Sequence, residues 1–265
     1  MSTIYVPEKP KLIVAKRPIN GVAFDLEGNG IDVESFHFAA HVETANSLGI
    51  SIDLNDQEAF NQLILTVVPH FIGGPDRAIM EEFVALAEQR GTRKKTNGEE
   101  RENQLKQLLK HDHTIYRDLL DAQDSIEPRE GFIEFLEQLR SMDIPMAIGS
   151  LTDDNDARVI LEKSGLNERF HPNNIILRSH VKEVKPDPEV YIKTAERMGV
   201  DPGFQLVFGD SHNDMRAARG AGSLPIGMPT VWQPTVLDRM RDAGAIAVFR
   251  DWKDVTIDSL RSIER

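Results

Sequence analysis

The segment GVAFDLEGNG, residues 21–30, decides the fold of this chain. It opens with a short apolar run that ends in Asp25, and it continues through a second acid, Glu27, into glycines. A short run that is apolar on both faces is typical of a strand buried in a parallel sheet, and glycines release the backbone into a turn. We therefore predict a buried strand over residues 21–25 that carries Asp25 at its C-terminal end.

The second half of the chain contains further short apolar runs, with amphipathic segments between them. The runs cover residues 144–150, 174–178, 205–209, 223–227 and 245–249, and the amphipathic segments include 130–142, 153–164, 187–199 and 213–221. Such alternation predicts parallel strands joined by crossover helices. The predicted fold class is α/β, with a Rossmann-like parallel sheet as its core.

The residues between the first strand and the second follow a helical pattern instead. Apolar side chains recur at helical spacing around residues 36–48, 79–87 and 105–120. This pattern predicts an inserted all-helical domain. The predicted organisation is an N-terminal extension over 1–20, a core formed by 21–35 and 125–265, and a helical insert over 36–124. Within the extension, we expect an edge strand over residues 11–15.

The composition excludes several classes of protein and site. The chain has 265 residues, 40% of them hydrophobic, and its net charge of −12 argues against nucleic acid or an anionic membrane as a partner. The absence of cysteine excludes disulfides, zinc–thiolate sites and a thiol nucleophile. The first residues lack the apolar run of a secretory signal, and no stretch approaches the ~20 apolar residues of a membrane span. We therefore expect a cytoplasmic protein.

Acidic, hydroxyl and basic side chains lie near the predicted C-terminal ends of the strands. They are Asp25 and Glu27 after the first strand, Ser150 and Thr152 after the second, Asp210 and Asp214 after the fourth, and Lys185 before the helix 187–199. In an open parallel sheet, these ends form one ligand-binding edge. Because hard oxygen ligands bind Mg²⁺ and a lysine can neutralise the remaining charge, the set predicts a Mg²⁺ site that holds a phosphoryl group.

Four motifs at these positions resemble those of the haloacid dehalogenase superfamily. FDLEGNGID resembles the first motif, IGS the second, VKPDPEVY the third and FGDSHNDMRAARGAG the fourth, in the same order along the chain. The resemblance covers about residues 21 to 250. It implies the Rossmann-like core of that superfamily, with the helical insert as its cap between the first and second motifs.

The resemblance also implies roles for the side chains in phosphoryl transfer. Asp25 would be the nucleophile that forms an aspartyl-phosphate, and Glu27 the general acid and then the general base. Ser150 would donate to a phosphoryl oxygen, and Thr152 beside it would also bind the substrate. Lys185 would lie between Asp25 and the phosphate and match their charge.

The same resemblance implies a set of Mg²⁺ ligands. They would be the Asp25 carboxylate, the backbone carbonyl of Glu27, and Asp210, with Asp214 orienting the waters of the metal site. For Asp214, an alternative interpretation is simply a negative charge at the N-terminus of a helix.

Three residues after Asp25 depart from the family pattern. Glu27 stands where the family usually has a second Asp, although the enolase-phosphatase branch is similar in carrying Asp-x-Glu. Asn29 and Gly30 replace the usual Thr or Val and a large apolar residue. We expect these two replacements to loosen the turn after the nucleophile.

The insert resembles the small helical cap of phosphoglycolate phosphatases, sugar-phosphate phosphatases and β-phosphoglucomutase. FIGGPDRAI, residues 71–79, resembles the substrate-specificity loop of that cap, in which Arg77 could bind a distal phosphate or carboxylate. His37 lies near the expected hinge and could assist proton transfer. For both side chains, the alternative is an ordinary packing or surface role.

The predicted function is a Mg²⁺-dependent phosphatase that closes its cap over a small phosphorylated metabolite. A β-phosphoglucomutase-like mutase is one alternative, weakened because His111 and Asp112 stand where a mutase cap helix has basic residues. A catalytically weakened relative that binds metal and phosphate is another, and a dehalogenase is disfavoured because it needs no metal. The sequence leaves open the particular substrate and the choice between monomer and homodimer.

Overall fold

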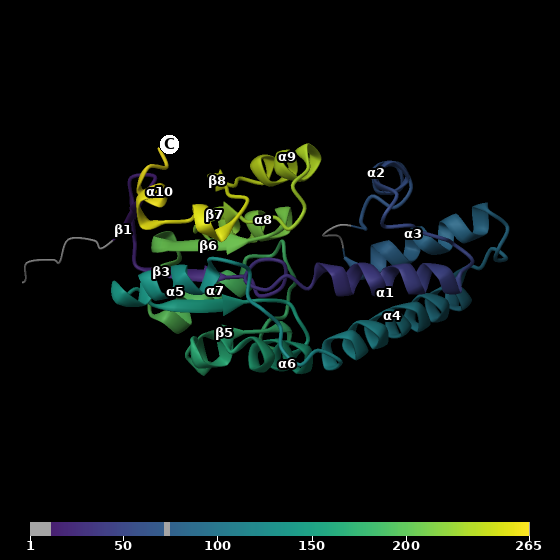
Figure 1. Cartoon of the computed structure of the whole chain (residues 1–265), viewed down its shortest axis with the longest axis horizontal. Coiled ribbons are helices and arrows are strands. Elements are labelled where there is room, and N and C mark those ends of the chain that lie inside the picture. Colours follow the sequence, from purple (N-terminus) through teal and green to yellow (C-terminus); the bar gives the residue numbers. More distant parts are fainter. Residues whose placement is uncertain (1–11, 72–74, 265) are drawn as a thin grey trace, which may run out of the picture. The chain divides into compact units, whose positions relative to one another are not determined.

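The computed structural model describes residues 12–71 and 75–264. The chain divides into two compact units, Met1–Asp32 with Asp124–Arg265, and Val33–Gln123 (Figure 1). Most of the predicted N-terminal extension and the centre of the predicted specificity loop lie outside the described residues. Within the described residues, none of the helices has both the length and the apolar character that crossing a bilayer requires.

A six-stranded parallel sheet forms the centre of the first unit. In spatial order its strands are β5 (Ile175–Ile176), β4 (Met146–Gly149), β3 (Gly21–Phe24), β6 (Gln205–Gly209), β7 (Leu224–Gly227) and β8 (Ala247–Val248). Each of the six strands predicted for the core, from residues 21–25 to 245–249, contains one of these strands, and the α/β class is confirmed. The strand that carries the first motif is central, because β3 pairs with β4 on one side and β6 on the other.

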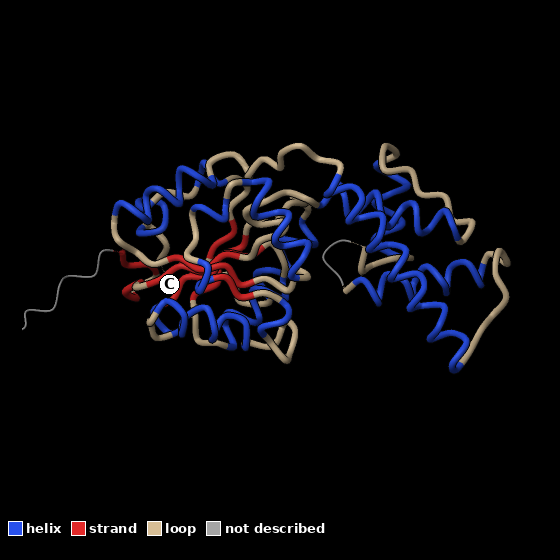
Figure 2. The backbone as a smooth tube through the Cα atoms, turned by 90° about the horizontal axis from the view of Figure 1, so that it is seen from below, coloured by secondary structure: helices blue, strands red, loops and turns tan. Residues whose placement is uncertain are grey.

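Helices cover both faces of this sheet (Figure 2). They are α5 (Phe132–Ser141), α6 (Asp154–Ser164), α7 (Glu189–Met198), α8 (His212–Gly220) and α9 (Pro234–Asp242). A further short helix, α10 (Ile257–Arg261), packs against residues 12–14 instead. Short 3₁₀ turns lie at Leu166–Glu168, Pro172–Asn174, Arg178–His180, Pro202–Phe204 and Trp252–Asp254. The covering helices explain why β3 and β6 are apolar on both faces.

An aromatic cluster fixes the end of β3. The ring of Phe24 stacks on Phe208 of β6 at 5.5 Å and contacts Phe132 at 5.3 Å edge to face, and Trp252 lies 5.8 Å away. All four side chains are buried. Because Phe24 directly precedes Asp25, this packing positions the predicted nucleophile; truncation of such a ring to alanine costs about 3–5 kcal/mol.

The predicted edge strand does not join the main sheet. Leu12–Val14 (β1) pairs antiparallel with Arg17–Ile19 (β2) in a separate two-stranded sheet. Ala15 and Lys16 connect them with φ of 48° and 61°, the left-handed conformation of tight hairpin turns. The hairpin turn therefore directs this strand to its sequence neighbour.

The second unit is helical within its described residues. Its helices are α1 (Glu34–Ser47), α2 (Gln57–Thr66), α3 (Asp76–Gln89) and α4 (Gly98–Asp121). The sequence pattern indicated three of them and missed α2, which begins after Asp56, whose carboxylate accepts from the Ala59 amide at 3.1 Å. The rings of Phe38, Phe60 and Phe83 surround Phe71 in its core.

Candidate active site

Asp25 directly follows β3, and both its backbone amide and its carboxylate form hydrogen bonds. Its amide donates to the carbonyl of Phe208 at 2.9 Å, which extends the pairing of β3 with β6. Its Oδ1 accepts from the amide of Leu26, also at 2.9 Å, and only 12% of the side chain is exposed. Asp25 is therefore a largely buried carboxylate in a fixed orientation.

Lys185 joins Asp25 to a second acid. Its Nζ lies 3.0 Å from Asp25 Oδ1 and 2.7 Å from Asp214 Oδ1, and its side chain is 7% exposed. The ammonium also lies 5.1 Å from the ring centre of Tyr191, within the range of a cation–π contact. The buried ammonium of Lys185 thus pairs with two buried carboxylates that follow different strands.

Asp214 is saturated by donors. Oδ1 accepts from Lys185 and from the Tyr191 hydroxyl at 2.6 Å, and Oδ2 accepts from the hydroxyl and the amide of Ser211 at 2.5 and 3.2 Å. The Ser211 contacts form a capping box at the start of α8. Gly209 leaves the necessary space, since a Cβ there would lie 2.3 Å from Asp214 Cβ. Asp214 therefore orients Lys185 and, with Ser211, caps the start of α8.

These contacts shift the pKa values in opposite directions. Burial raises the pKa of Asp25 to about 6, with Lys185 opposing the rise and Asp214 adding to it. Burial would also raise the pKa of Asp214, but Lys185, Ser211 and Tyr191 outweigh it and hold that pKa below its usual range. For Lys185, burial lowers the pKa, and the two carboxylates more than offset this so that the ammonium stays charged. Burial, followed by the charge of Asp214, raises the pKa of Tyr191, so its hydroxyl stays a donor.

Three acids lie close enough to surround one cation. Asp25, Asp210 and Asp214 each offer a carboxylate oxygen, and these oxygens lie within 4.8 Å of one another. Carboxylates are hard ligands that suit Mg²⁺. Because the oxygens of Asp214 already accept four hydrogen bonds, Asp25 and Asp210 fit the role of direct ligands better than Asp214 does.

Gly28 makes room for Asp210. It has a φ of +70°, and a Cβ at this position would lie 2.3 Å from Asp210 Oδ2. The Asp210 carboxylate therefore lies directly against the backbone of the turn that follows Asp25. This close approach accounts for the glycine in the first motif.

Glu27, Thr152 and Ser150 form a chain of hydrogen bonds. The Thr152 hydroxyl donates to Glu27 Oε1 at 2.5 Å and lies 2.8 Å from the Ser150 hydroxyl. Since the single proton of Thr152 goes to Glu27, the Ser150 hydroxyl donates to Thr152 in this arrangement. The three residues come together because β3 and β4 are neighbours.

Asn29 and Gly30 both make close contacts in the turn after Asp25. Asn29 is fully buried, and its Nδ2 donates to the carbonyls of Asp25 at 3.0 Å and Phe208 at 3.3 Å. A Cβ on Gly30 would lie 2.6 Å from the ring of Phe132, so this ring occupies the space that the family's apolar residue would need. The sequence could not reveal these contacts, because Phe132 and Phe208 lie about a hundred positions or more away, and the expected loosening of the turn stays a prediction.

Sequence reasoning missed three side chains that support the site. Tyr191 and Ser211, which hold Asp214, lie within the third and fourth motifs, so the motifs could have revealed them. Arg129 has no such signal: its guanidinium binds backbone carbonyls that come from distant parts of the sequence.

Arg77 and His37 lie in the helical unit. The guanidinium of Arg77 binds Glu102 at 2.7 and 3.1 Å and Glu81 at 3.0 Å, so carboxylates of its own unit already balance its charge. A substrate role for Arg77 would have to break these bonds. The ring of His37 stacks on Tyr116 at 4.1 Å. The predicted roles of both side chains stay predictions.

The same unit contains a buried polar cluster and an open hollow. Asp112 accepts from Thr44 at 3.1 Å and lies 2.9 Å from His41 Nδ1, and all three side chains are buried between α1 and α4. The hollow has a volume of about 630 Å³ and is lined by polar side chains from residues 93–107. It contains none of the predicted site residues.

Comparison with known proteins adds sequence relatives. Residues 19–222 match the family model of haloacid dehalogenase-like hydrolases. A fructose-1-phosphate phosphatase, YqaB of Escherichia coli K12, is 26% identical over 210 residues, which are 76% of this chain and 92% of the relative. A phosphorylated carbohydrates phosphatase of Thermotoga maritima is 28% identical over 204 residues, 77% of this chain and 82% of the relative. An E. coli K12 phosphoglycolate phosphatase is 28% identical over 223 residues, 79% of this chain and 81% of the relative.

Solved structures share the fold. A HAD hydrolase of family IA, variant 3, from Entamoeba histolytica aligns with a TM-score of 0.72 at 22% identity, over 92% of this chain and 99% of that one. A β-phosphoglucomutase from Clostridium difficile aligns with a TM-score of 0.65 at 20% identity, over 92% and 96%. At these identities, the similarity concerns the fold alone.

Proposed function

Because the chain belongs to the haloacid dehalogenase-like hydrolase family, we propose that it is a magnesium-dependent phosphatase of small phosphorylated metabolites. The substrate class that we propose is a sugar phosphate or a similar phosphomonoester. Membership of the family confirms the resemblance that the four motifs indicated and the prediction of a hydrolytic enzyme.

The observation that carries the proposal is the arrangement around Asp25. Its carboxylate is oriented by Lys185 and Leu26, and its oxygen lies within 4.8 Å of oxygens of Asp210 and Asp214. A carboxylate with a pKa of about 6 is largely ionised at neutral pH and can act as a nucleophile. An anionic nucleophile needs positive charge beside it to approach an anionic phosphate, and Lys185 supplies part of that charge.

In the first half of the proposed reaction, a carboxylate oxygen of Asp25 forms a bond to phosphorus while the bond from phosphorus to the substrate oxygen breaks. Glu27 gives its proton to the leaving oxygen, which departs as an alcohol. In the second half, Glu27 takes a proton from water as the water oxygen bonds to phosphorus. The Asp25–phosphate bond then breaks, which releases inorganic phosphate and restores the carboxylate.

Asp25, Asp210 and the backbone carbonyl of Glu27 would hold the magnesium ion. When bound, the ion supplies positive charge that offsets the charge of the phosphoryl oxygens. Asp214 keeps Lys185 in place through the bond at 2.7 Å. Thr152 orients the carboxyl of Glu27 through the bond at 2.5 Å, and rotation of the Ser150 hydroxyl would let it donate to a phosphoryl oxygen.

The names of the sequence relatives support the proposed substrate class. These relatives are named as phosphatases of fructose 1-phosphate, of phosphorylated carbohydrates and of phosphoglycolate. A phosphomutase is the second candidate, because structures of β-phosphoglucomutases share the fold over more than nine-tenths of this chain. A mutase would return the phosphoryl group to the sugar and release no phosphate.

Phosphate release from p-nitrophenyl phosphate, and then from a panel of sugar phosphates and phosphoglycolate, tests the proposal. We expect hydrolysis that needs Mg²⁺, stops with EDTA and is abolished by Asp25→Asn. Asp238→Asn is the matched control, because Asp238 is 69% exposed on α9.

Two results would count against the proposal. Conversion of a glucose 1-phosphate into glucose 6-phosphate without phosphate release would favour the mutase. Equal inertness of the wild type and Asp25→Asn across the panel would favour a binding protein without catalysis.

A further inference from the structure

Arg129 lies beside the turn that follows Asp25. Its amide donates to the carbonyl of Gly30 at 2.9 Å, and Pro128 pairs with Ile31 in an isolated antiparallel bridge. The backbone of Arg129 is therefore tied to this turn before its side chain is considered.

The guanidinium of Arg129 binds five backbone carbonyls. They belong to Gly28 at 2.8 Å, Met228 at 2.7 Å, Arg250 at 3.1 Å, Asn29 at 3.4 Å and Pro229 at 3.5 Å. These carbonyls come from three loops, which follow β3, β7 and β8. One side chain thus joins three loops at the catalytic edge of the sheet.

The order of the strands shows how far apart these loops begin. β3 and β7 are separated by β6, and neighbouring strands lie about 4.8 Å apart, so strand ends that far apart would be roughly 10 Å from each other. A single guanidinium reaches carbonyls from all three loops only because they curve toward one another beyond the end of β6. That strand end carries Asp210.

Gly28, whose carbonyl accepts from Arg129 at 2.8 Å, is also the residue against which Asp210 packs. A Cβ on Gly28 would lie 2.3 Å from Asp210 Oδ2. Displacement of the Gly28 backbone therefore changes the space available to that carboxylate. The next residue, Asn29, is tied in turn to the carbonyl of Asp25 at 3.0 Å.

The hydrogen bonds of Arg129 within the described chain go to neutral carbonyls, although Asp32, Asp210 and Asp251 are near enough to influence its charge. Burial lowers the pKa of Arg129, and the three acids oppose this. A planar fork of donors suits several carbonyls at fixed angles, which a lysine ammonium on a flexible stem does not match.

From these contacts we infer that Arg129 is a positioning residue: it fixes the Gly28–Asn29 turn and thereby the separation of the Asp25 and Asp210 carboxylates. The inference deepens the proposed function and rests on it where catalysis is concerned. On this inference, a side chain outside the four motifs sets the relative positions of the carboxylates that would bind the metal.

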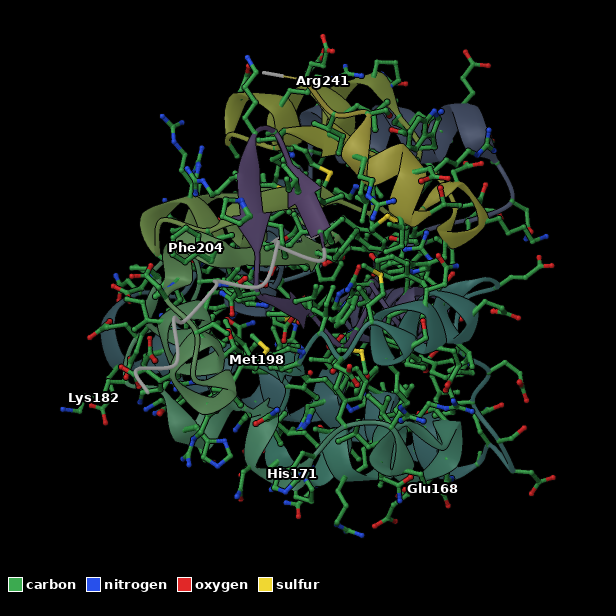
Figure 3. The ribbon with its side chains drawn as sticks, turned by 90° about the vertical axis from the view of Figure 1, so that its left-hand side faces the viewer. Glu168, His171, Lys182, Met198, Phe204 and Arg241 are labelled. Carbon is green, nitrogen blue, oxygen red and sulfur yellow. The ribbon has the colours of Figure 1, made fainter. Side chains whose placement is uncertain are left out.

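Two variants, Arg129→Gln and Arg129→Lys, test the inference. The same two changes at Arg241 are the matched controls. Arg241 lies at the surface of α9 (Figure 3), where it is 59% exposed and bonds to Asp238. Mn²⁺ binding without substrate, followed by electron paramagnetic resonance, reports on the carboxylates. Hydrogen exchange at the amides of Gly28 and Ile31 reports on the turn, because these amides bond to the carbonyls of Ile31 and Leu26.

For Arg129→Gln, we expect kcat to fall about 100-fold with little change in KM, because a small misplacement of catalytic groups has this effect. Mn²⁺ affinity should fall about 10-fold, as it does when groups that orient metal ligands are removed. Exchange at Gly28 and Ile31 should accelerate at least about tenfold. Arg129→Lys should lie between the wild type and Arg129→Gln, and both Arg241 variants should match the wild type.

Arg129→Gln with wild-type exchange at Gly28 and Ile31 and wild-type Mn²⁺ affinity would overturn the inference. If Arg129→Gln does not fold, Arg129→Lys decides in the same way, since it keeps the cation but not the fork of donors. If the wild type hydrolyses no phosphate ester, the proposed function fails. Exchange and Mn²⁺ affinity still decide the role of Arg129 in that case.

Discussion

Lys185 donates to the carboxylate of Asp25 across 3.0 Å, and both side chains are largely withdrawn from solvent. The same ammonium reaches Asp214 at 2.7 Å. Two buried carboxylates thus depend on one cation, which makes Lys185 important to folding as well as to the proposed chemistry.

Lys185→Met should impair both properties. Removing the cation leaves two buried carboxylates facing each other without a counter-charge, and breaking a buried ion pair in this way costs about 3–5 kcal/mol of unfolding free energy. Urea denaturation measures the loss, and phosphate release measures the activity, which we expect to disappear. Lys253→Met is the control, because Lys253 forms an exposed ion pair with Glu130 and should leave both unchanged. An unaltered unfolding free energy in Lys185→Met would contradict the pairing.

Gly28→Ala should damage the site more than the same change elsewhere. Gly28 and Gly165 both have a φ of +70°, but a Cβ at Gly165 meets nothing within 4 Å, whereas one at Gly28 meets Asp210 Oδ2 at 2.3 Å. Gly165→Ala therefore measures the cost of the backbone conformation alone, on the order of 1 kcal/mol. We expect Gly28→Ala to lose phosphatase activity and Mn²⁺ affinity in addition. Equal behaviour of the two variants in both assays would remove the packing argument.

Mg²⁺ affinity should depend on pH through Asp25. In the metal-free protein its pKa is raised from 3.8 to about 6, so below pH 6 the ion must displace a proton. Affinity should be constant above pH 7 and fall about tenfold per unit below pH 6. Isothermal titration with Mg²⁺ measures it, and Asp25→Asn should abolish this step; a step of the same size in Asp25→Asn would assign it to another group.

The same shift has a defined effect on the stability of the metal-free protein. A carboxyl whose pKa is higher in the folded state than in the unfolded state favours folding while it is protonated. The contribution of Asp25 is therefore complete below about pH 4 and is lost as the pH rises through about 6.

Gly30 and Phe132 should behave as a coupled pair. Gly30→Ala places a Cβ 2.6 Å from the ring of Phe132, and such overpacking costs about 1–3 kcal/mol. Phe132→Leu shortens the side chain and should relieve part of that cost in the double variant. A double-mutant cycle by urea denaturation measures the coupling, and additive effects of the two changes would mean that the ring does not occupy this space.

The sequence was sufficient for the sheet and for the groups at its edge. Each predicted strand contains an observed strand, because a short run that is apolar on both faces is typical of a strand buried in a parallel sheet. Asp25, Lys185 and Asp214 come into direct contact at one edge of the sheet, where their positions near the strand ends placed them.

What the sequence did not reveal was contact between distant backbone segments. Arg129 is a lone basic residue between a proline and an acid, and its function lies in carbonyls of residues 28–29, 228–229 and 250, which no pattern of side chains records. The contacts of Asn29 were hidden for a similar reason, since its partners are the carbonyls of Asp25 and Phe208.

The bridge between Ile31 and Pro128 has a consequence for deletion of the helical unit. The polypeptide leaves the sheet-containing unit and returns to it through two paired segments, so the ends left by excising the intervening residues would already be neighbours. A short glycine-rich connector from Asp32 to Ser125 should give a truncated enzyme that folds. Such a protein would separate the intrinsic chemistry of the carboxylate cluster from whatever selectivity the helices confer.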